Sequence, residues 1–245
     1  AIGTPLYIYF NDAQFAAAKD EPGVKMTTTL PKAWRNVRAG DRIYFNDGQI
    51  LARVVKVHEW YVEAKVVTHG GKRKAIKQGT GIHLPDSFTH LTVPPLTDRD
   101  LELLPFIAEH ADMIGLSFVH TPYDLRKLYH LLAEQGAASL PVIAKIETRE
   151  ALHNVARILM EGLTLPSFGV MIARGDLALE VGFEHMAAIQ REILALCRAA
   201  HIPVIWSTQV LEQLAKKGLP SRAEISDVSV GQQAQCIMLN KGMHI

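Results

Sequence analysis

Charged side chains stand where two apolar runs of the sequence end. The run VIAKIE ends with Lys145 and Glu147, and the run VMIARGD ends with Arg174, Gly175 and Asp176. On a strand, residues i and i+2 point to the same side, so Lys145 and Glu147 share one direction. Gly175 lets backbone amides approach a ligand closely, and two carboxylates with substrate oxygens and water form a usual magnesium site. A lysine beside that metal suits an anionic, oxygen-rich substrate.

These charges have a second interpretation, as salt bridges that only close the rim of a sheet. For Arg174 we favour the structural interpretation. For Lys145, Glu147 and Asp176 taken together we favour the site. Other apolar runs also end in polar residues, which supports a shared polar rim: Ser117 and His120 after one run, Ser207, Thr208 and Gln209 after another, and Asn240 and Lys241 after the last.

The elements that position these residues alternate from Thr97 onward. A capping-box pair, Thr97 and Asp100, opens a helical pattern. Continuous apolar runs then predict parallel strands buried on both faces, and their ends recur at intervals of 27, 28, 34 and 32 residues. This rhythm favours a (β/α)8 barrel over an open doubly wound sheet, because no glycine-rich dinucleotide or P-loop motif is present. The strand candidates are 112–118, 140–147, 167–174, 202–208 and 235–240, and the helix candidates are 122–135, 148–161, 184–200 and 209–232, the last broken at Gly218-Leu219-Pro220 and restarted by Ser221 and Glu224 in capping-box spacing.

The first 90 residues have a different rhythm. Short aromatic and β-branched runs predict strands, and Asn46-Asp47-Gly48 predicts a hairpin turn between two of them. Only the segment DAQFAAAKD hints at a helix. This part carries 13 Lys and Arg against 8 Asp and Glu, whereas the remainder carries 13 against 17. The run Lys72-Arg73-Lys74 is either a solvated hairpin tip, which we favour, or a surface for anionic phosphates.

Composition narrows the class of protein. The chain has 245 residues, of which 48% are apolar and 21% charged, and its net charge is +1, so it suits a soluble enzyme-sized protein. That charge gives no hint of nucleic acid, and no apolar run approaches the roughly 18 residues that span a membrane. Cys197 and Cys236 both lie in apolar segments, so we expect two buried free thiols and a cytoplasmic location.

Four segments resemble, in order and spacing along the chain, the signature segments of the pyruvate kinase family: KIETREAL, MIARGDLALE, PVIWSTQVLEQLAKKGLPSRAEISDV and CIMLNKG. The segment GDRIYFNDGQI resembles the hairpin of that family's small lid domain. The resemblance implies an α/β fold, a partial (β/α)8 TIM barrel over 92–245 with a small all-β, barrel-like lid over 1–91. It also implies transfer of a phosphoryl group from phosphoenolpyruvate to ADP, giving pyruvate and ATP.

The resemblance assigns roles to individual residues. Lys145 becomes the catalytic lysine that neutralises the phosphoryl group, and Glu147 and Asp176 ligate Mg2+ or Mn2+. The amides of Gly175 and Asp176 hold the substrate carboxylate, and Thr208 belongs to the relay that protonates the enolate. The remaining assignments are Ser117 and Phe118 to the substrate site and Asp47, in the lid hairpin, to the nucleotide. A K+ ion is also implied, with ligands that are not in this chain.

The sequence departs from the family pattern at three places. Ala178 replaces a glycine, His120 replaces an arginine or lysine, and Asn240-Lys241-Gly242 replaces Ser-Gly-Glu-Thr. The family's first three barrel strands have no counterpart, so we expect a fragment of a longer protein that has little activity alone. Its outermost strands, near 112–118 and 235–240, would be open edges that favour a homo-oligomer. Two other functions stay open: a metal-dependent lyase or aldolase acting on pyruvate enolates, and a non-catalytic binding module.

Overall fold

The computed structural model describes residues 1–18, 22–46, 48–70, 75–87 and 94–244. The chain divides into two compact units, Ala1–Val93 and Pro94–Ile245. Among the described residues, no helix has the length and apolar character needed to cross a bilayer. Asp47 and the run Lys72-Arg73-Lys74 lie outside the described residues.

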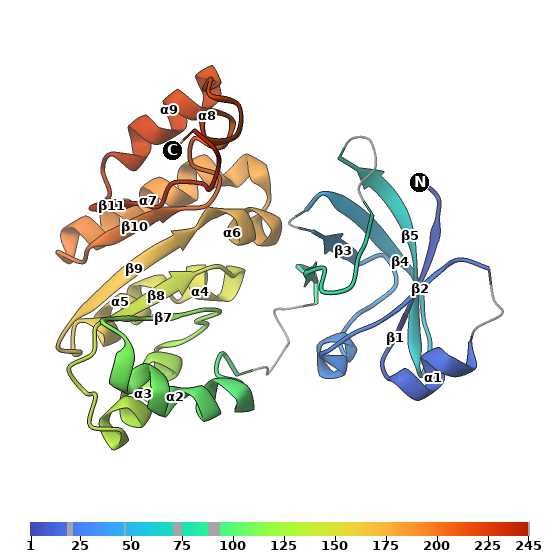
Figure 1. The fold of residues 1–245 in the computed structure, drawn as a ribbon, viewed down its shortest axis with the longest axis horizontal. Helices are drawn as coiled ribbons and strands as arrows, with labels where there is room; N and C mark the ends of the chain where they lie inside the picture. The colour runs from blue at the N-terminus through green and yellow to red at the C-terminus, as the bar shows by residue number, and fades with distance from the viewer. Residues whose placement is uncertain (19–21, 47, 71–74, 88–93, 245) are drawn as a thin grey trace. The chain divides into compact units, whose positions relative to one another are not determined.

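The first unit is a six-stranded mixed sheet with the strand order β2-β1-β5-β4-β3-β6 (Figure 1). Side chains alternate between buried and exposed along its strands, which gives the sheet one apolar face over a core that includes Trp34 and Phe45. The predicted hairpin is confirmed, because β3 and β4 pair antiparallel on either side of Asn46, whose φ is 54°. The elements are β1 (Pro5–Tyr9), α1 (Asp12–Ala17), β2 (Val24–Thr27), the 3-10 helix η1 (Pro31–Trp34), β3 (Arg42–Phe45), β4 (Ile50–Val57), β5 (Tyr61–His69) and β6 (Ile82–His83).

The second unit is a five-stranded parallel sheet with the order β11-β10-β9-β8-β7, so neighbours in space are neighbours in sequence. The colours of Figure 1 follow this order from green to red. The fold class is therefore confirmed as α/β with a partial (β/α)8 barrel, and its two outermost strands are the two that the sequence predicted. The strands are β7 (Ile114–Leu116), β8 (Val142–Ile146), β9 (Phe168–Ala173), β10 (Val204–Ser207) and β11 (Cys236–Ile237).

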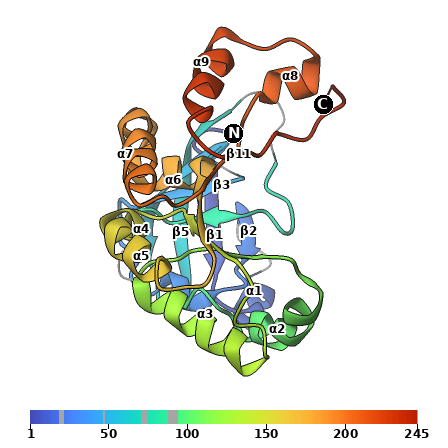
Figure 2. The same cartoon turned by 90° about the vertical axis from the view of Figure 1, so that its left-hand side faces the viewer.

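Helices connect the strands and pack on one another in chain order. Figure 2 shows α3, α5 and α7 in a row, and contacts join α3 to α5 and α5 to α7. Capping boxes close the starts of α2 and α9 as the sequence predicted, with Thr97 and Ser221 as caps. The helices are α2 (Asp98–His110), α3 (Pro122–Glu134), α4 (Arg149–His153), α5 (Val155–Gly162), α6 (Arg174–Val181), α7 (Met186–Ala199), α8 (Glu212–Lys217) and α9 (Arg222–Gly231), with the 3-10 helix η3 (Phe183–His185) before α7.

Three local predictions were wrong. The helix α6 begins directly at Arg174, whereas no helix was predicted between residues 161 and 184, because Leu177, Leu179 and Val181 mimic a period of two. β11 keeps only two of the six residues predicted for it. Cys236 is exposed because it lies on this outermost strand, whereas Cys197 is buried in the core, and both thiols are free.

Candidate active site at the ends of the parallel strands

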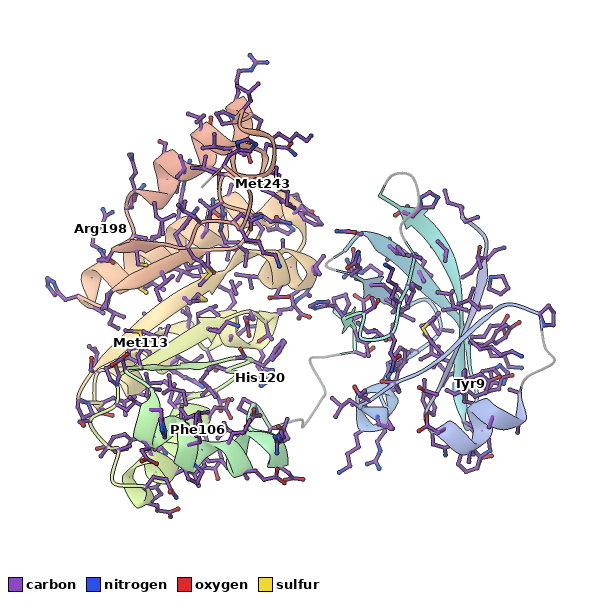
Figure 3. The ribbon with its side chains drawn as sticks, viewed as in Figure 1. Tyr9, Phe106, Met113, His120, Arg198 and Met243 are labelled. Atoms are coloured by element: carbon purple, nitrogen blue, oxygen red, sulfur yellow. The ribbon has the colours of Figure 1, made fainter. Side chains whose placement is uncertain are left out.

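Figure 3 marks the two ends of the first parallel strand, since Met113 precedes β7 and His120 follows it. The polar residues singled out in the sequence follow the strands at the His120 end. His120 itself is buried, and its amide donates to Asp124 of α3 while its carbonyl accepts from Asn154. The backbone of His120 thus fixes the start of α3.

Lys145 and Glu147 form the best-defined contact of this rim. The Lys145 Nζ lies 2.6 Å from Glu147 Oε1 and donates to Ser117 Oγ at 2.7 Å. The Glu147 side chain is 2% exposed, whereas that of Lys145 is 27% exposed. A buried carboxylate needs a counter-charge, and the partly exposed side chain of Lys145 supplies it.

Phe118 joins the same cluster through its backbone. Its amide donates to Glu147 Oε2 at 2.6 Å, so each oxygen of Glu147 has its own donor. Phe118 has a φ of 53°, in the left-handed region that residues other than glycine seldom adopt. Glu147 therefore holds a strained backbone at the end of β7 as well as a cation.

A second set of contacts joins the ends of β9 and β10. The Gly175 amide, in the first turn of α6, donates to Thr208 Oγ1 at 2.7 Å, and Asp176 follows in the same turn. Thr208 and Gln209 are both left-handed, with φ of 66° and 53°. Because a β-branched residue resists this conformation, each such residue costs on the order of 1–3 kcal/mol and needs support from its surroundings.

Arg174 provides contacts to that strained segment. Its Nε donates to the Ser207 carbonyl at 3.0 Å and its Nη2 to the Thr208 carbonyl at 2.5 Å. Its Nη1 pairs with Asp227 of α9, and its guanidinium lies 4.4 Å from the ring centroid of Trp206. The sequence did not reveal Asp227 as a partner of Arg174, because the two residues lie 53 positions apart and no local pattern links them.

The residues suited to bind a metal ion are carboxylates. Among the described residues, no group of three or more His, Cys, Asp and Glu side chains could hold a metal ion. Glu147 and Asp176 follow the ends of the adjacent strands β8 and β9. Carboxylate oxygens are hard donors, and Mg2+ commonly uses one or two of them with substrate and water oxygens. In the structure the two oxygens of Glu147 already accept from Lys145 and from the Phe118 amide, so a metal role for Glu147 and Asp176 stays a prediction.

Comparisons with known proteins agree with this arrangement. Residues 4–243 match the family model described as "Pyruvate kinase, barrel domain". The chain belongs to the pyruvate kinase family. It is 39% identical over 207 residues to a pyruvate kinase of Thermococcus litoralis, covering 82% of this chain and 41% of that protein.

Two further pyruvate kinases show the same extent of similarity. The chain is 36% identical over 203 residues to that of Thermotoga maritima, covering 82% of this chain and 40% of the relative. It is 33% identical over 236 residues to that of Hypocrea jecorina, covering 95% and 41%. The chain thus spans about two-fifths of the length of the curated relatives it matches, so the activity of a whole protein is a matter for proposal.

Proposed function

We propose that the protein containing this chain transfers a phosphoryl group between phosphoenolpyruvate and ADP, with pyruvate and ATP as products. The observation that carries the proposal is the cluster of Lys145, buried Glu147 and Ser117 at the ends of β7 and β8. Phosphoryl transfer depends mainly on positioning and on neutralising charge. A lysine fixed by two partners at a polar rim meets both demands.

In this proposal Lys145 presents its ammonium to the transferring phosphoryl group. Its contacts with Glu147 and Ser117 restrict it to one direction, which lowers the entropy lost on reaching the transition state. Glu147 and Asp176 would hold the divalent metal, Mg2+ or Mn2+, which would neutralise phosphoryl oxygens when bound. A K+ ion, if used, takes ligands outside this chain.

The remaining roles divide between carboxylate binding and proton transfer. The amides of Gly175 and Asp176 lie in the first turn of α6, where the helix dipole favours an anion. They would receive the substrate carboxylate, with the Gly175 amide exchanging its bond to the Thr208 hydroxyl for one to substrate. Thr208 belongs to the proton relay to the enolate, and its hydroxyl already lies on the Gly175 amide. Ser117 and Phe118 border the substrate.

The first unit supplies the nucleotide side of the proposed reaction. In this proposal Asp47, in the hairpin between β3 and β4, contacts the nucleotide. The proposed assembly is a homo-oligomer, because the outermost strands β7 and β11 each have one neighbour in the sheet of the described residues. The proposed location is the cytoplasm.

A non-catalytic binding module is the second candidate. The observation that favours it is the segment Asn240-Lys241-Gly242, which lacks the carboxylate that the family has there. A module of this kind would bind a phosphorylated acid or a nucleotide without turnover. It would keep the Lys145 cluster as an anion site.

The experiment is a coupled pyruvate and ATP assay with phosphoenolpyruvate, ADP and Mg2+, run on this chain and on a full-length protein that contains it. Turnover that EDTA abolishes and that Glu147→Gln reduces at least 100-fold supports the kinase. Glu161→Gln is the matched control, because Glu161 pairs with Arg126 at the surface and lies away from the rim. Binding of phosphoenolpyruvate without ATP formation favours the module, and pyruvate-enolate cleavage without ATP favours the lyase.

A further inference from the structure

The guanidinium of Arg174 is directed at the backbone of its own unit. Two of its nitrogens donate to consecutive carbonyls, those of Ser207 and Thr208, and the third pairs with Asp227. Its side chain is 10% exposed. Arg174 is therefore placed to shape the chain at the end of β10.

Consecutive carbonyls face one guanidinium only when the chain turns between them. That turn occurs where Thr208 and Gln209 enter the left-handed region, with Leu211 left-handed just beyond at φ 48°. A threonine in this conformation persists only when its surroundings fix it. The two donors of Arg174 bracket Thr208 and so supply that constraint.

The guanidinium is itself held from two other sides. The ring of Trp206, which is fully buried, lies under it at 4.4 Å, and Asp227 approaches from α9. The same helix packs on Trp206 through Gly231, where an added Cβ would come within 2.8 Å of the ring. Arg174 thus connects α9 to the turn at Thr208.

We propose that Arg174 is a positioning residue that fixes the left-handed turn at Thr208 and thereby holds the Thr208 hydroxyl on the Gly175 amide. The inference rests on the proposed function only where Thr208 acts on substrate, because the contact with Gly175 is a property of the fold. Lysine cannot replace Arg174. A planar fork reaches two carbonyls and a carboxylate together, whereas an ammonium is a single point of charge.

The first test uses hydrogen exchange of single amides in this chain. Arg174→Met should speed exchange of the Gly175 amide at least tenfold and leave the Ile172 amide, inside β9, within a factor of two. Thr208→Val should have the same effect on Gly175, because it removes the acceptor. Adding Arg174→Met to Thr208→Val should then change Gly175 exchange little further.

Two more variants complete the test. Arg174→Lys should behave like Arg174→Met, since charge alone does not hold both carbonyls. Arg126→Met, which removes an arginine paired with Glu161 on another face, should leave Gly175 unchanged. An unchanged Gly175 amide in Arg174→Met would overturn the inference, as would an equal rise at every amide of the sheet, which would indicate a role in overall stability alone.

Activity of the full-length protein separates this inference from the proposed function. Arg174→Met should lower kcat by at least tenfold with a smaller change in KM, approaching the effect of Thr208→Val. If the exchange results hold but Thr208→Val keeps full turnover, the proposed role of Thr208 fails and the positioning contact stands. If Thr208→Val is inactive while Arg174→Met is fully active, the positioning role is wrong.

Discussion

The strained backbone that follows β7 and the one that follows β10 are stabilised by different kinds of contact. Each is followed by a left-handed residue other than glycine, Phe118 after β7 and Thr208 after β10. At the first end, the carboxylate of Glu147 accepts from the Phe118 amide. At the second, Arg174 donates to the carbonyls on both sides of the turn.

The difference lies in what else each supporting residue does. Glu147 also pairs with Lys145, so the proposed metal ligand, the proposed catalytic lysine and the strained backbone share one carboxylate. Arg174 has no proposed contact with substrate and acts through Thr208. At the end of β7, a substitution should therefore lower activity and stability together. At the end of β10, the effects of a substitution on activity and on stability should be separable.

The largest expected effect is that of Lys145→Met on turnover. A charge that faces the transferring phosphoryl group acts mainly in the transition state. We expect turnover of the full-length protein to fall by about a thousandfold or more, which corresponds to roughly 4 kcal/mol. The coupled assay measures this, with Lys217→Met on the exposed face of α8 as control. Near-normal ATP formation by Lys145→Met would show that the lysine is structural.

Glu147→Ala should give the largest loss of stability at the first end. It removes the acceptor of the Phe118 amide and the counter-charge of Lys145 together, and we expect unfolding free energy to fall by about 2–4 kcal/mol. Glu147→Gln should lose less, because its amide oxygen can still accept from Phe118. Urea unfolding of the whole chain measures both variants.

The Cys197 thiol gives a second measure of the same loss. It is fully buried, and burial raises its pKa to about 12, so it reacts with a thiol reagent only when the second unit opens. Its labelling should be faster in Glu147→Ala than in the parent chain. Equal labelling rates would mean that Glu147 does not support the fold and that the two ends do not differ as described.

The order of the sheet was predictable, and its detailed geometry was not. Repeated apolar runs and helical patterns give strands in sequence order, because right-handed β-α units leave few alternatives. Polar residues at the run ends located the rim, and Lys145 and Glu147 were predicted to share a direction from their spacing alone. Their contact at 2.6 Å agrees with that geometry.

The sequence failed where tertiary contacts override local preference. The left-handed Phe118 and Thr208 carry no glycine signal, since Glu147 and Arg174 impose their conformation from elsewhere in the chain. The partnership of Arg174 with Asp227 was not visible for the same reason. Asp47 lies outside the described residues, so its assignment stays a prediction. The roles assigned to the other site residues also stay predictions: Ser117, Phe118, Lys145, Glu147, Gly175, Asp176 and Thr208.

Gly231→Ala tests how closely α9 packs on Trp206 near the end of β10. Alanine favours a helix by about 1 kcal/mol over glycine, yet its Cβ would press on the Trp206 ring at 2.8 Å. Overpacking of this kind costs about 1–3 kcal/mol, so we expect a net loss of stability and a changed near-ultraviolet signal of tryptophan. Ser226→Ala, on the exposed side of α9, is the control. A stabilised Gly231→Ala variant would show that α9 is free to shift away from Trp206.

The smallest expected effect compares two serines, one at each end. Ser117 accepts from Lys145 at 2.7 Å, whereas Ser207 donates to the Ile172 carbonyl at 2.9 Å and is fully buried. Ser117→Ala and Ser207→Ala should each lower the unfolding free energy by about 0.5–1.5 kcal/mol, the usual net value of one hydrogen bond. Only Ser117→Ala should also weaken phosphoenolpyruvate binding by the full-length protein, because its loss frees Lys145 to move. Titration calorimetry beside urea unfolding measures both quantities, and an equal loss of binding in Ser207→Ala would mean that the two ends work as one unit.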